Sequence, residues 1–257
     1  MNYLSALILG IVEGLTEFLP VSSTAHMLLT ERLLNLSSTD FVKTFTISIQ
    51  LGAILAVLVL YWRQLWNDKA LWGKIIAAFL PTAVLGLLFY KIIKTYLLEN
   101  LQLIAWTLLI GGLIIIVFEL ATKKHSKNSS AVDFQTISYT QATIIGLAQA
   151  VAFIPGVSRS AATILGGLSL KINRQTIVAF SFLLAIPTML AATGLDLLKN
   201  AGGFNSSQIE LWLIGFVTSF VVAILVIKGF IKFVAKHDFI IFGIYRIILG
   251  LIILWLL

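Results

Sequence analysis

Two carboxylates inside a segment hydrophobic enough for lipid constrain this chain more than any other feature. Glu13 and Glu17 lie in GIVEGLTEFLPVSSTAH, residues 10–26. A charge at membrane depth is costly, so an intramembrane glutamate indicates a function by default. On a helix the two side chains share one face and repel each other unless they share a proton or a cation. We therefore favour a functional pair over the simpler reading, a structural pair that shares a proton.

The same segment predicts a break in a helix. Pro20 removes a backbone donor and disfavours helical geometry at Leu19, and three residues suited to an N-cap follow, namely Ser22, Ser23 and Thr24. The flanking helices, residues 3–19 and 22–34, are short, because the first reaches only about 25 Å across a hydrocarbon core of about 30 Å. We expect a re-entrant hairpin whose tip presents helix N–H groups to an anion, phosphate in particular.

Composition places the whole chain in a membrane. Of its 257 residues, 59% are hydrophobic and 11% are charged, and the mean hydropathy is +1.02. Soluble domains carry about a quarter charged residues. We predict an all-α polytopic membrane protein with six further apolar runs that can span as helices, at residues 45–62, 75–93, 101–120, 176–195, 209–227 and 239–257. The absence of cysteine excludes disulfides and thiolate chemistry.

The chain contains an internal repeat. At an offset of 136 residues, Gly10 aligns with Gly146 and Glu13 with Gln149, and three more pairs follow, namely Ser22 with Ser158, Thr24 with Ser160 and Ala25 with Ala161. Each copy holds one hairpin and three spans. Because three is odd, the second copy is inverted, and broken helices in such repeats meet near the midplane to form a binding site. We predict a single membrane domain, with repeat one at about 1–122, a polar connector at 123–135 and repeat two at about 136–257.

The basic residues predict the orientation of the chain. The net charge is +7, but these residues lie in short loops between apolar runs, which favours membrane orientation over nucleic-acid binding. One side holds eleven of them: Arg63, Lys69, Lys74, Lys123, Lys124, Lys127, Lys171, Arg174, Lys228, Lys232 and Lys236. The other holds five: Arg32, Lys43, Lys91, Lys94 and Lys199. The first side is predicted to be cytoplasmic, so that the first hairpin faces outward and the second enters from inside.

The second hairpin carries a candidate anion clamp. In FIPGVSRSAAT, residues 153–163, Pro155 and Gly156 break the helix and Ser158 is suited to cap the next one. Arg159 follows directly, between two serines. A guanidinium at a helix N-terminus combines a planar donor fork with backbone N–H groups, which suits a phosphate. If the two tips meet, this arginine faces the carboxylates and His26 of the first hairpin.

These motifs resemble one known family. EGLTEFLPVSSTAH and PGVSRSAAT, together with residues 49–63 and 180–189 and with Tyr245 and Arg246, resemble the undecaprenyl-diphosphate phosphatases of the bacitracin-resistance type over essentially the whole chain. The resemblance implies hydrolysis of a C55 polyprenyl diphosphate at the outer face of the bacterial plasma membrane, which recycles the cell-wall lipid carrier. It also implies a divalent cation and a set of active-site residues, namely Glu13, Glu17, Ser22, Ser23, Thr24, His26, Ser158, Arg159, Ser160 and Thr163.

The roles of these residues form a hypothesis. Arg159 and the two helix N-termini would bind the phosphate oxygens, with Ser22, Thr24, Ser158, Ser160 and Thr163 as substrate-binding residues. Glu13 and Glu17 would bind Mg²⁺ or Ca²⁺, because hard cations take oxygen ligands. One turn separates Ser23 from His26, so we favour Ser23 as the nucleophile with His26 as its base. His26 as the nucleophile, or water activated by it, are the alternatives.

A secondary transporter or a lipid-phosphate flippase is the alternative function. Inverted repeats with broken helices and midplane charges are the signature of transporters. The expected partners are a polyprenyl diphosphate and membrane lipids, without nucleic acid, and the sequence leaves the oligomeric state open, a homo-oligomer included. Release of phosphate in detergent would separate the two functions, because transport requires a sealed membrane and hydrolysis does not.

Overall fold

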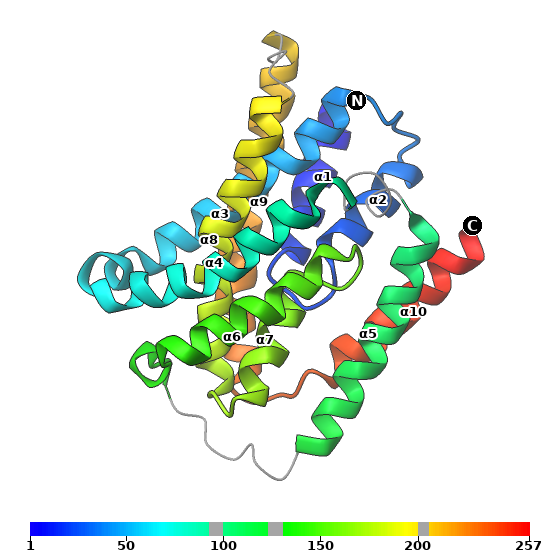
Figure 1. Ribbon diagram of the computed structural model, residues 1–257. Helices are drawn as coiled ribbons and strands as arrows, with labels where there is room; N and C mark the ends of the chain where they lie inside the picture. Colours follow the sequence, from blue (N-terminus) through cyan, green and yellow to red (C-terminus); the bar gives the residue numbers. More distant parts are fainter. Residues whose placement is uncertain (93–99, 123–130, 200–205) are drawn as a thin grey trace.

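The computed structural model describes residues 1–92, 100–122, 131–199 and 206–257. In this part of the chain all regular structure is helical (Figure 1). The elements are α1 (Tyr3–Thr16), α2 (Ser23–Leu33), α3 (Asp40–Asn67), α4 (Lys69–Ile92), α5 (Leu101–Thr122), η3 (Phe134–Thr136), α6 (Tyr139–Ala150), η4 (Val151–Phe153), α7 (Arg159–Ser169), α8 (Arg174–Lys199), α9 (Ser206–Val234) and α10 (Ile240–Leu256).

Five helices of the described chain are long and apolar enough to cross a membrane: α3, α4, α5, α8 and α9. Their outward faces carry large apolar side chains such as Leu88, Leu113 and Leu225, which are exposed in the isolated chain and suited to lipid. The predicted polytopic membrane protein is confirmed. The sixth predicted span, residues 239–257, forms α10, which has 17 residues and is shorter than the other spans. Lys94 and most of the predicted connector lie outside the described residues.

Both predicted breaks are present in the backbone. Helix α1 ends at Thr16, three residues earlier than predicted, because the chain already turns before Pro20. The second break follows α6 and η4 and contains Gly156, whose φ of +91° is a conformation that favours glycine. As predicted, Ser158 caps α7, since its hydroxyl accepts a hydrogen bond from the Ala161 N–H at 3.3 Å. Each break therefore separates two short helices.

The two halves have corresponding backbone features at the predicted offset of 136 residues. Helices α1 and α2 begin at Tyr3 and Ser23, and α6 and α7 begin at Tyr139 and Arg159. Left-handed φ angles in residues other than glycine occur in the described chain in two corresponding pairs, which are Ser22 with Ser158 and Asn35 with Lys171. Such angles are uncommon outside glycine, so their recurrence at one spacing supports the alignment of the two halves.

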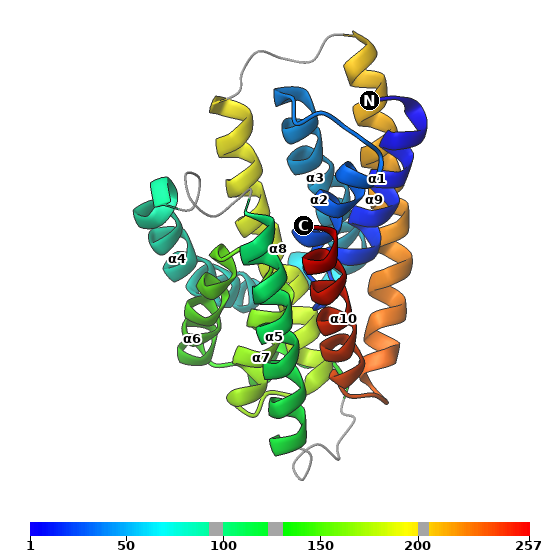
Figure 2. The same cartoon turned by 90° about the vertical axis from the view of Figure 1, so that its right-hand side faces the viewer.

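The first short helix of each hairpin packs against a span of the opposite half. Helix α1 contacts α9 and α6 contacts α4, while α3 packs on α8 at the centre and α5 lies beside α10 (Figures 1 and 2). Two glycines permit the close approach. A Cβ on Gly10 would lie 2.6 Å from the Gly215 carbonyl oxygen, and one on Gly146 would lie 1.9 Å from that of Ala78. This interleaving brings both breaks to the interior of the bundle.

Candidate active site

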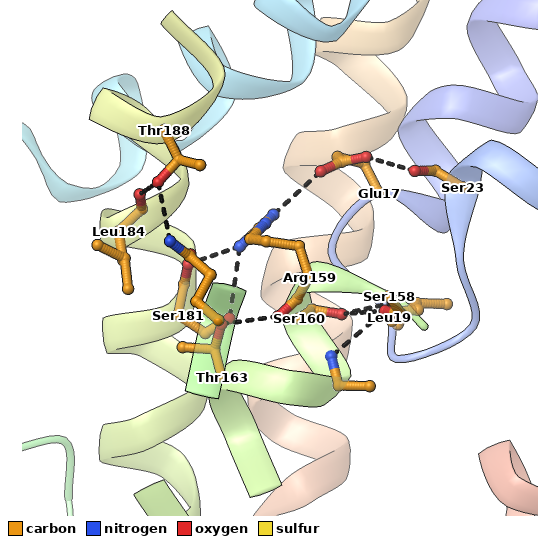
Figure 3. A network of polar contacts seen from close by, with 12 residues as sticks. Glu17, Leu19, Ser23, Ser158, Arg159, Ser160, Thr163, Ser181, Leu184 and Thr188 are labelled. Carbon is orange, nitrogen blue, oxygen red and sulfur yellow. Dashed lines mark hydrogen bonds and ion pairs between the residues drawn. The ribbon is translucent and has the colours of Figure 1, made fainter. Parts of the chain in front are cut away.

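An ion pair joins the two breaks. Arg159 Nη2, at the start of α7, lies 3.0 Å from Glu17 Oε1, at the end of α1 (Figure 3). The two side chains are 13% and 7% exposed. The prediction that the tips meet, with an acid of one facing the guanidinium of the other, is confirmed. A buried pair of this kind is held in place by the packing of both hairpins.

Glu17 also fixes Ser23. The Ser23 hydroxyl donates a 2.6 Å hydrogen bond to Oε2 of Glu17, the oxygen that Arg159 leaves free (Figure 3). The carboxylate therefore bridges a hydroxyl on its own hairpin and a guanidinium on the other one. A carboxylate within hydrogen-bond reach is a candidate proton acceptor for this hydroxyl.

The predicted pairing of Ser23 with His26 is wrong in this structure. His26 Nδ1 lies 2.7 Å from the Ser22 carbonyl oxygen, and Nε2 lies 2.7 Å from the hydroxyl of Tyr245 on α10. A carbonyl only accepts, so Nδ1 carries the proton and Nε2 accepts from the tyrosine in the neutral ring. The ring folds back over its own helical turn and stacks on Tyr245, with centroids 5.6 Å apart. Both ring nitrogens are thus used away from the serine.

Two further contacts orient Arg159. Nη1 donates to the Ser181 carbonyl oxygen at 2.7 Å, and the guanidinium lies 5.8 Å from the centre of the Phe18 ring. Its Nε is buried and has no hydrogen-bond partner in the described chain. The arginine is rigidly held and still has a donor to offer, which suits an anion-binding role.

Glu13 is buried without a partner. It is 0% exposed, and neither carboxylate oxygen has a hydrogen-bond partner among the residues that the structure describes. A carboxyl group in such a place has to be either protonated or paired with a cation. Together with Glu17 one turn later it offers oxygen donors that fit a hard divalent cation. The described residues contain no group of three or more His, Cys, Asp or Glu side chains placed for a metal, so further ligands would come from hydroxyls, water or a phosphate.

A cavity of about 260 Å³ adjoins the ion pair. Six of the ten predicted site residues line it: Glu17, Ser22, Ser23, Thr24, Ser158 and Arg159. Four polar residues that were not predicted to bind line it as well: Gln50, Thr82, Gln149 and Thr188. The rest of the wall is mainly apolar and includes Phe153 and Met189. A polar head with an apolar tail fits this combination.

The other predicted hydroxyls support the breaks. Ser160 donates to the Leu19 carbonyl oxygen at 2.7 Å, across the two hairpins, and Thr163 donates to the Arg159 carbonyl oxygen at 2.7 Å. Both residues are fully buried. Neither of them lines the cavity, and the same holds for Glu13 and His26. Contact of Ser160 or Thr163 with a substrate stays a prediction.

Arg246 is the main supporting residue that we did not predict to act at the site. It is fully buried in α10, and its guanidinium donates to four backbone carbonyl oxygens, those of Pro20 at 3.3 Å, Thr107 at 3.2 Å, Gly156 at 2.8 Å and Val157 at 2.8 Å. One side chain thus ties both breaks to α5. The signal in the sequence is an arginine in the middle of an apolar helix, which is as costly in lipid as a glutamate.

The fold and the site together define a polytopic helical membrane protein whose buried carboxylates, hydroxyls and guanidinium surround an interior cavity. The family described as bacitracin resistance protein BacA matches residues 6–252, and the chain belongs to this family.

The curated relatives match over nearly their whole length. The chain is 48% identical to the undecaprenyl-diphosphatase of Aquifex aeolicus over 252 residues, which cover 98% of this chain and 97% of the relative. It is 51% identical to that of Campylobacter hominis over 252 residues (97% and 97%) and 51% identical to that of Persephonella marina over 257 residues (99% and 98%). The family resemblance predicted from the two motifs is confirmed.

Proposed function

We propose that this chain is an undecaprenyl-diphosphatase, which hydrolyses undecaprenyl diphosphate to undecaprenyl phosphate and inorganic phosphate in a bacterial membrane. Relatives of this name match nearly the whole chain. The observation that carries the proposal is the contact series from Arg159 through Glu17 to Ser23 at the wall of one cavity. It combines an anion-binding cation, a proton acceptor and a hydroxyl, which are the parts that phosphoryl transfer requires.

The phosphate oxygens bind to Arg159 and to the N-terminal N–H groups of α2 and α7. Both helices have 11 residues and begin at the breaks, so their positive dipole ends lie at the site. The hydroxyls of Ser22, Thr24 and Ser158 line the same cavity and are suited to contact the diphosphate. These groups oppose the charge that develops as the bridging P–O bond breaks.

Glu13 and Glu17 would hold a divalent cation, Mg²⁺ or Ca²⁺. The unpaired, fully buried carboxylate of Glu13 supports this assignment. A bound cation would neutralise part of the negative charge on the diphosphate and orient it.

Ser23 is the proposed nucleophile and Glu17 its proton acceptor. The serine oxygen attacks the terminal phosphorus, its proton passes through Glu17 to the leaving phosphate oxygen, and the bridging P–O bond breaks to release undecaprenyl phosphate. Water then hydrolyses the phosphoserine, which releases inorganic phosphate and restores the hydroxyl. The 2.6 Å hydrogen bond between Ser23 and Glu17 supports this route. Direct attack by water is the competing route.

The proposed membrane arrangement is a single domain that consists of two inverted repeats, at about 1–122 and 136–257. The equal spacing of helix starts and left-handed residues supports it, and so does the exchange of partners between α1 with α9 and α6 with α4.

The active site opens to the extracytoplasmic side of the plasma membrane in this proposal. Several segments with the excess of basic residues lie together, since Gln135 contacts Asp68, Lys74 contacts the Phe134 carbonyl oxygen and Arg174 pairs with Glu119. Tyr3 contacts Glu210, so the starts of α1 and α9 also lie side by side. This grouping supports the predicted orientation with the basic side in the cytoplasm.

The purified protein in detergent tests the proposal. We expect release of inorganic phosphate from undecaprenyl diphosphate without a sealed membrane, and loss of that release when a chelator removes divalent cations. A protein that moves the lipid across vesicles but releases no phosphate in detergent would instead be a transporter. The matched control is the same detergent mixture with Arg159→Ala protein purified in parallel.

A further inference from the structure

Gln149 lines the cavity, yet the mechanism above does not use it. It lies on α6, at the position that corresponds to Glu13 in the first half, and it is 1% exposed. The corresponding position thus carries a neutral amide in one half and a carboxylate in the other. A buried amide on a cavity wall has to satisfy two donors and one acceptor.

The surrounding hydrogen bonds determine which way this amide points. The Thr82 hydroxyl donates to the Gly146 carbonyl oxygen at 2.8 Å. The Thr188 hydroxyl donates to the Leu184 carbonyl oxygen at 2.8 Å (Figure 3). Each hydroxyl has only one proton, so towards Gln149 both oxygens can only accept. They accept from Nε2 of Gln149, at 3.0 Å from Thr82 and 3.2 Å from Thr188. A flipped amide would lose both bonds.

The amide nitrogen of Gln149 thus makes both hydrogen bonds, and the amide oxygen makes neither of them. Gln149 Oε1 is buried and has no hydrogen-bond partner in the described residues. Native proteins seldom leave a buried acceptor unpaired, so a donor from outside the chain is expected. An ionised phosphate oxygen does not supply one, because it only accepts. The proposed divalent cation already has the carboxylates of Glu13 and Glu17 as ligands, which leaves water as the fitting partner of the amide oxygen.

The cavity that Gln149 lines has room for water molecules. Its volume of about 260 Å³ exceeds several times the roughly 30 Å³ that one water occupies in the liquid. Glu17, Ser23 and Arg159 border the same space. A water between the amide and the phosphorus would therefore lie in reach of the groups that bind the phosphate.

We propose that Gln149 orients the hydrolytic water, by accepting a hydrogen bond at Oε1 from the proton that stays on the attacking oxygen. This inference rests on the proposed function. The water oxygen bonds to phosphorus, the bond from phosphorus to the Ser23 oxygen breaks, and the second water proton passes through Glu17 to that oxygen. The product is inorganic phosphate. A glutamine that orients attacking water has a precedent in GTP hydrolysis.

Gln149→Met is the central variant, because it keeps the approximate length of the side chain and removes the acceptor. We expect its kcat for phosphate release to fall about 100-fold, the cost of a misplaced reactant, and its KM to fall with it, because only hydrolysis of the phosphoserine is slowed. Gln149→Glu restores an acceptor oxygen, so its kcat should be at least about tenfold higher than that of Gln149→Met. Gln102→Met, an exposed glutamine on α5, is the matched control and should match the unchanged protein.

The readout specific to water is competition with methanol. Methanol can attack the phosphoserine in place of water, but it has only one hydroxyl proton and keeps none to donate to Oε1 of Gln149. The unchanged protein should therefore form mainly inorganic phosphate. Gln149→Met should raise the ratio of methyl phosphate to phosphate, whereas loss of a merely structural contact lowers kcat and leaves the ratio unchanged.

Four results would overturn the role of Gln149 alone: an unchanged kcat, an unchanged product ratio, a rise confined to KM, or a higher requirement for Mg²⁺ or Ca²⁺. A folding defect in Gln149→Met would leave Gln149→Glu to decide, since it should then retain at least about a tenth of the normal kcat and the original product ratio. An unchanged protein that releases no phosphate would overturn the proposed function together with this inference.

Discussion

Ser23 donates a 2.6 Å hydrogen bond to Glu17, while His26, one turn further along the same helix, contacts Ser22 and Tyr245 instead. The hydroxyl and the imidazole that their spacing predicts to act together therefore belong to separate contact networks. Glu17 connects Ser23 to Arg159 and hence to the second hairpin. His26 connects α2 to α10. We therefore expect the carboxylate of Glu17 to take part in the chemistry and the imidazole of His26 to hold α2 against α10.

The first prediction concerns the covalent intermediate. Protein that is mixed with terminally labelled undecaprenyl diphosphate and quenched within one turnover should carry an acid-stable phosphate on Ser23, because this oxygen lies next to a proton acceptor. Peptide mapping and the Ser23→Ala variant identify the site. An acid-labile label on His26 would show that the imidazole is the nucleophile, and no label at all would favour direct attack by water.

The cation gives a second prediction. Glu13 is fully buried with both oxygens unpaired in the described chain, so Glu13→Ala should remove a ligand. The Mg²⁺ or Ca²⁺ concentration for half-maximal phosphate release should rise at least about tenfold. The measurement is a titration of cation into chelator-treated protein. Asp40→Ala, an exposed acid at the start of α3, is the control and should leave the midpoint unchanged.

Arg246 carries a prediction about stability. Replacement by Met leaves four buried carbonyl oxygens without their donor, and hydrogen bonds to a charged group contribute about 1.5–3 kcal/mol each before relaxation. We expect a loss of about 3 kcal/mol or more in the free energy of unfolding, followed by denaturation in detergent. The same change at Arg63, an exposed arginine near the end of α3, should cost less than about 0.5 kcal/mol. Equal effects at both positions would contradict the assigned role.

A glycine pair tests the packing between the halves. A Cβ on Gly146 would lie 1.9 Å from the carbonyl oxygen of Ala78, which is backbone and cannot turn aside. Gly146→Ala should therefore force α6 away from α4 and lower both the Tm and phosphate release. Gly229→Ala on α9 is the matched control, because nothing lies within 4 Å of its Cβ and alanine favours a helix. A Gly146→Ala protein as stable as the control would contradict the packing described.

The sequence was sufficient for the parts that depend on local chemistry. Proline and glycine identified both breaks, Ser158 was predicted as a cap, and the charges of Glu17 and Arg159 in apolar segments predicted their meeting. The same offset of 136 residues separates the residues that share a left-handed backbone conformation, which was not predicted, because no φ angle can be read from residue types. Local rules work here because each break has to satisfy its own backbone groups.

The rest depended on neighbours that are distant in the chain. His26 contacts Tyr245, 219 positions later, so no spacing within the first hairpin could have predicted its partner. Arg246 serves carbonyl groups of both breaks, which become adjacent only after the halves interleave. Similarly, Thr82 and Thr188 orient Gln149 from two different spans. Helix α10 was predicted to begin one residue earlier and to reach the end of the chain, which overestimated its length.

The most direct measurement is the rate of phosphate release from undecaprenyl diphosphate by Arg159→Ala protein in detergent, compared with the unchanged protein and with Arg63→Ala. Arg159 joins the two hairpins and is the proposed phosphate ligand. We expect kcat/KM to fall at least about 1,000-fold while the protein stays folded, because an oxyanion-stabilising contact contributes about this much. Arg63→Ala should retain full activity. Folded Arg159→Ala protein that releases phosphate within a few-fold of the normal rate would contradict the site proposed here.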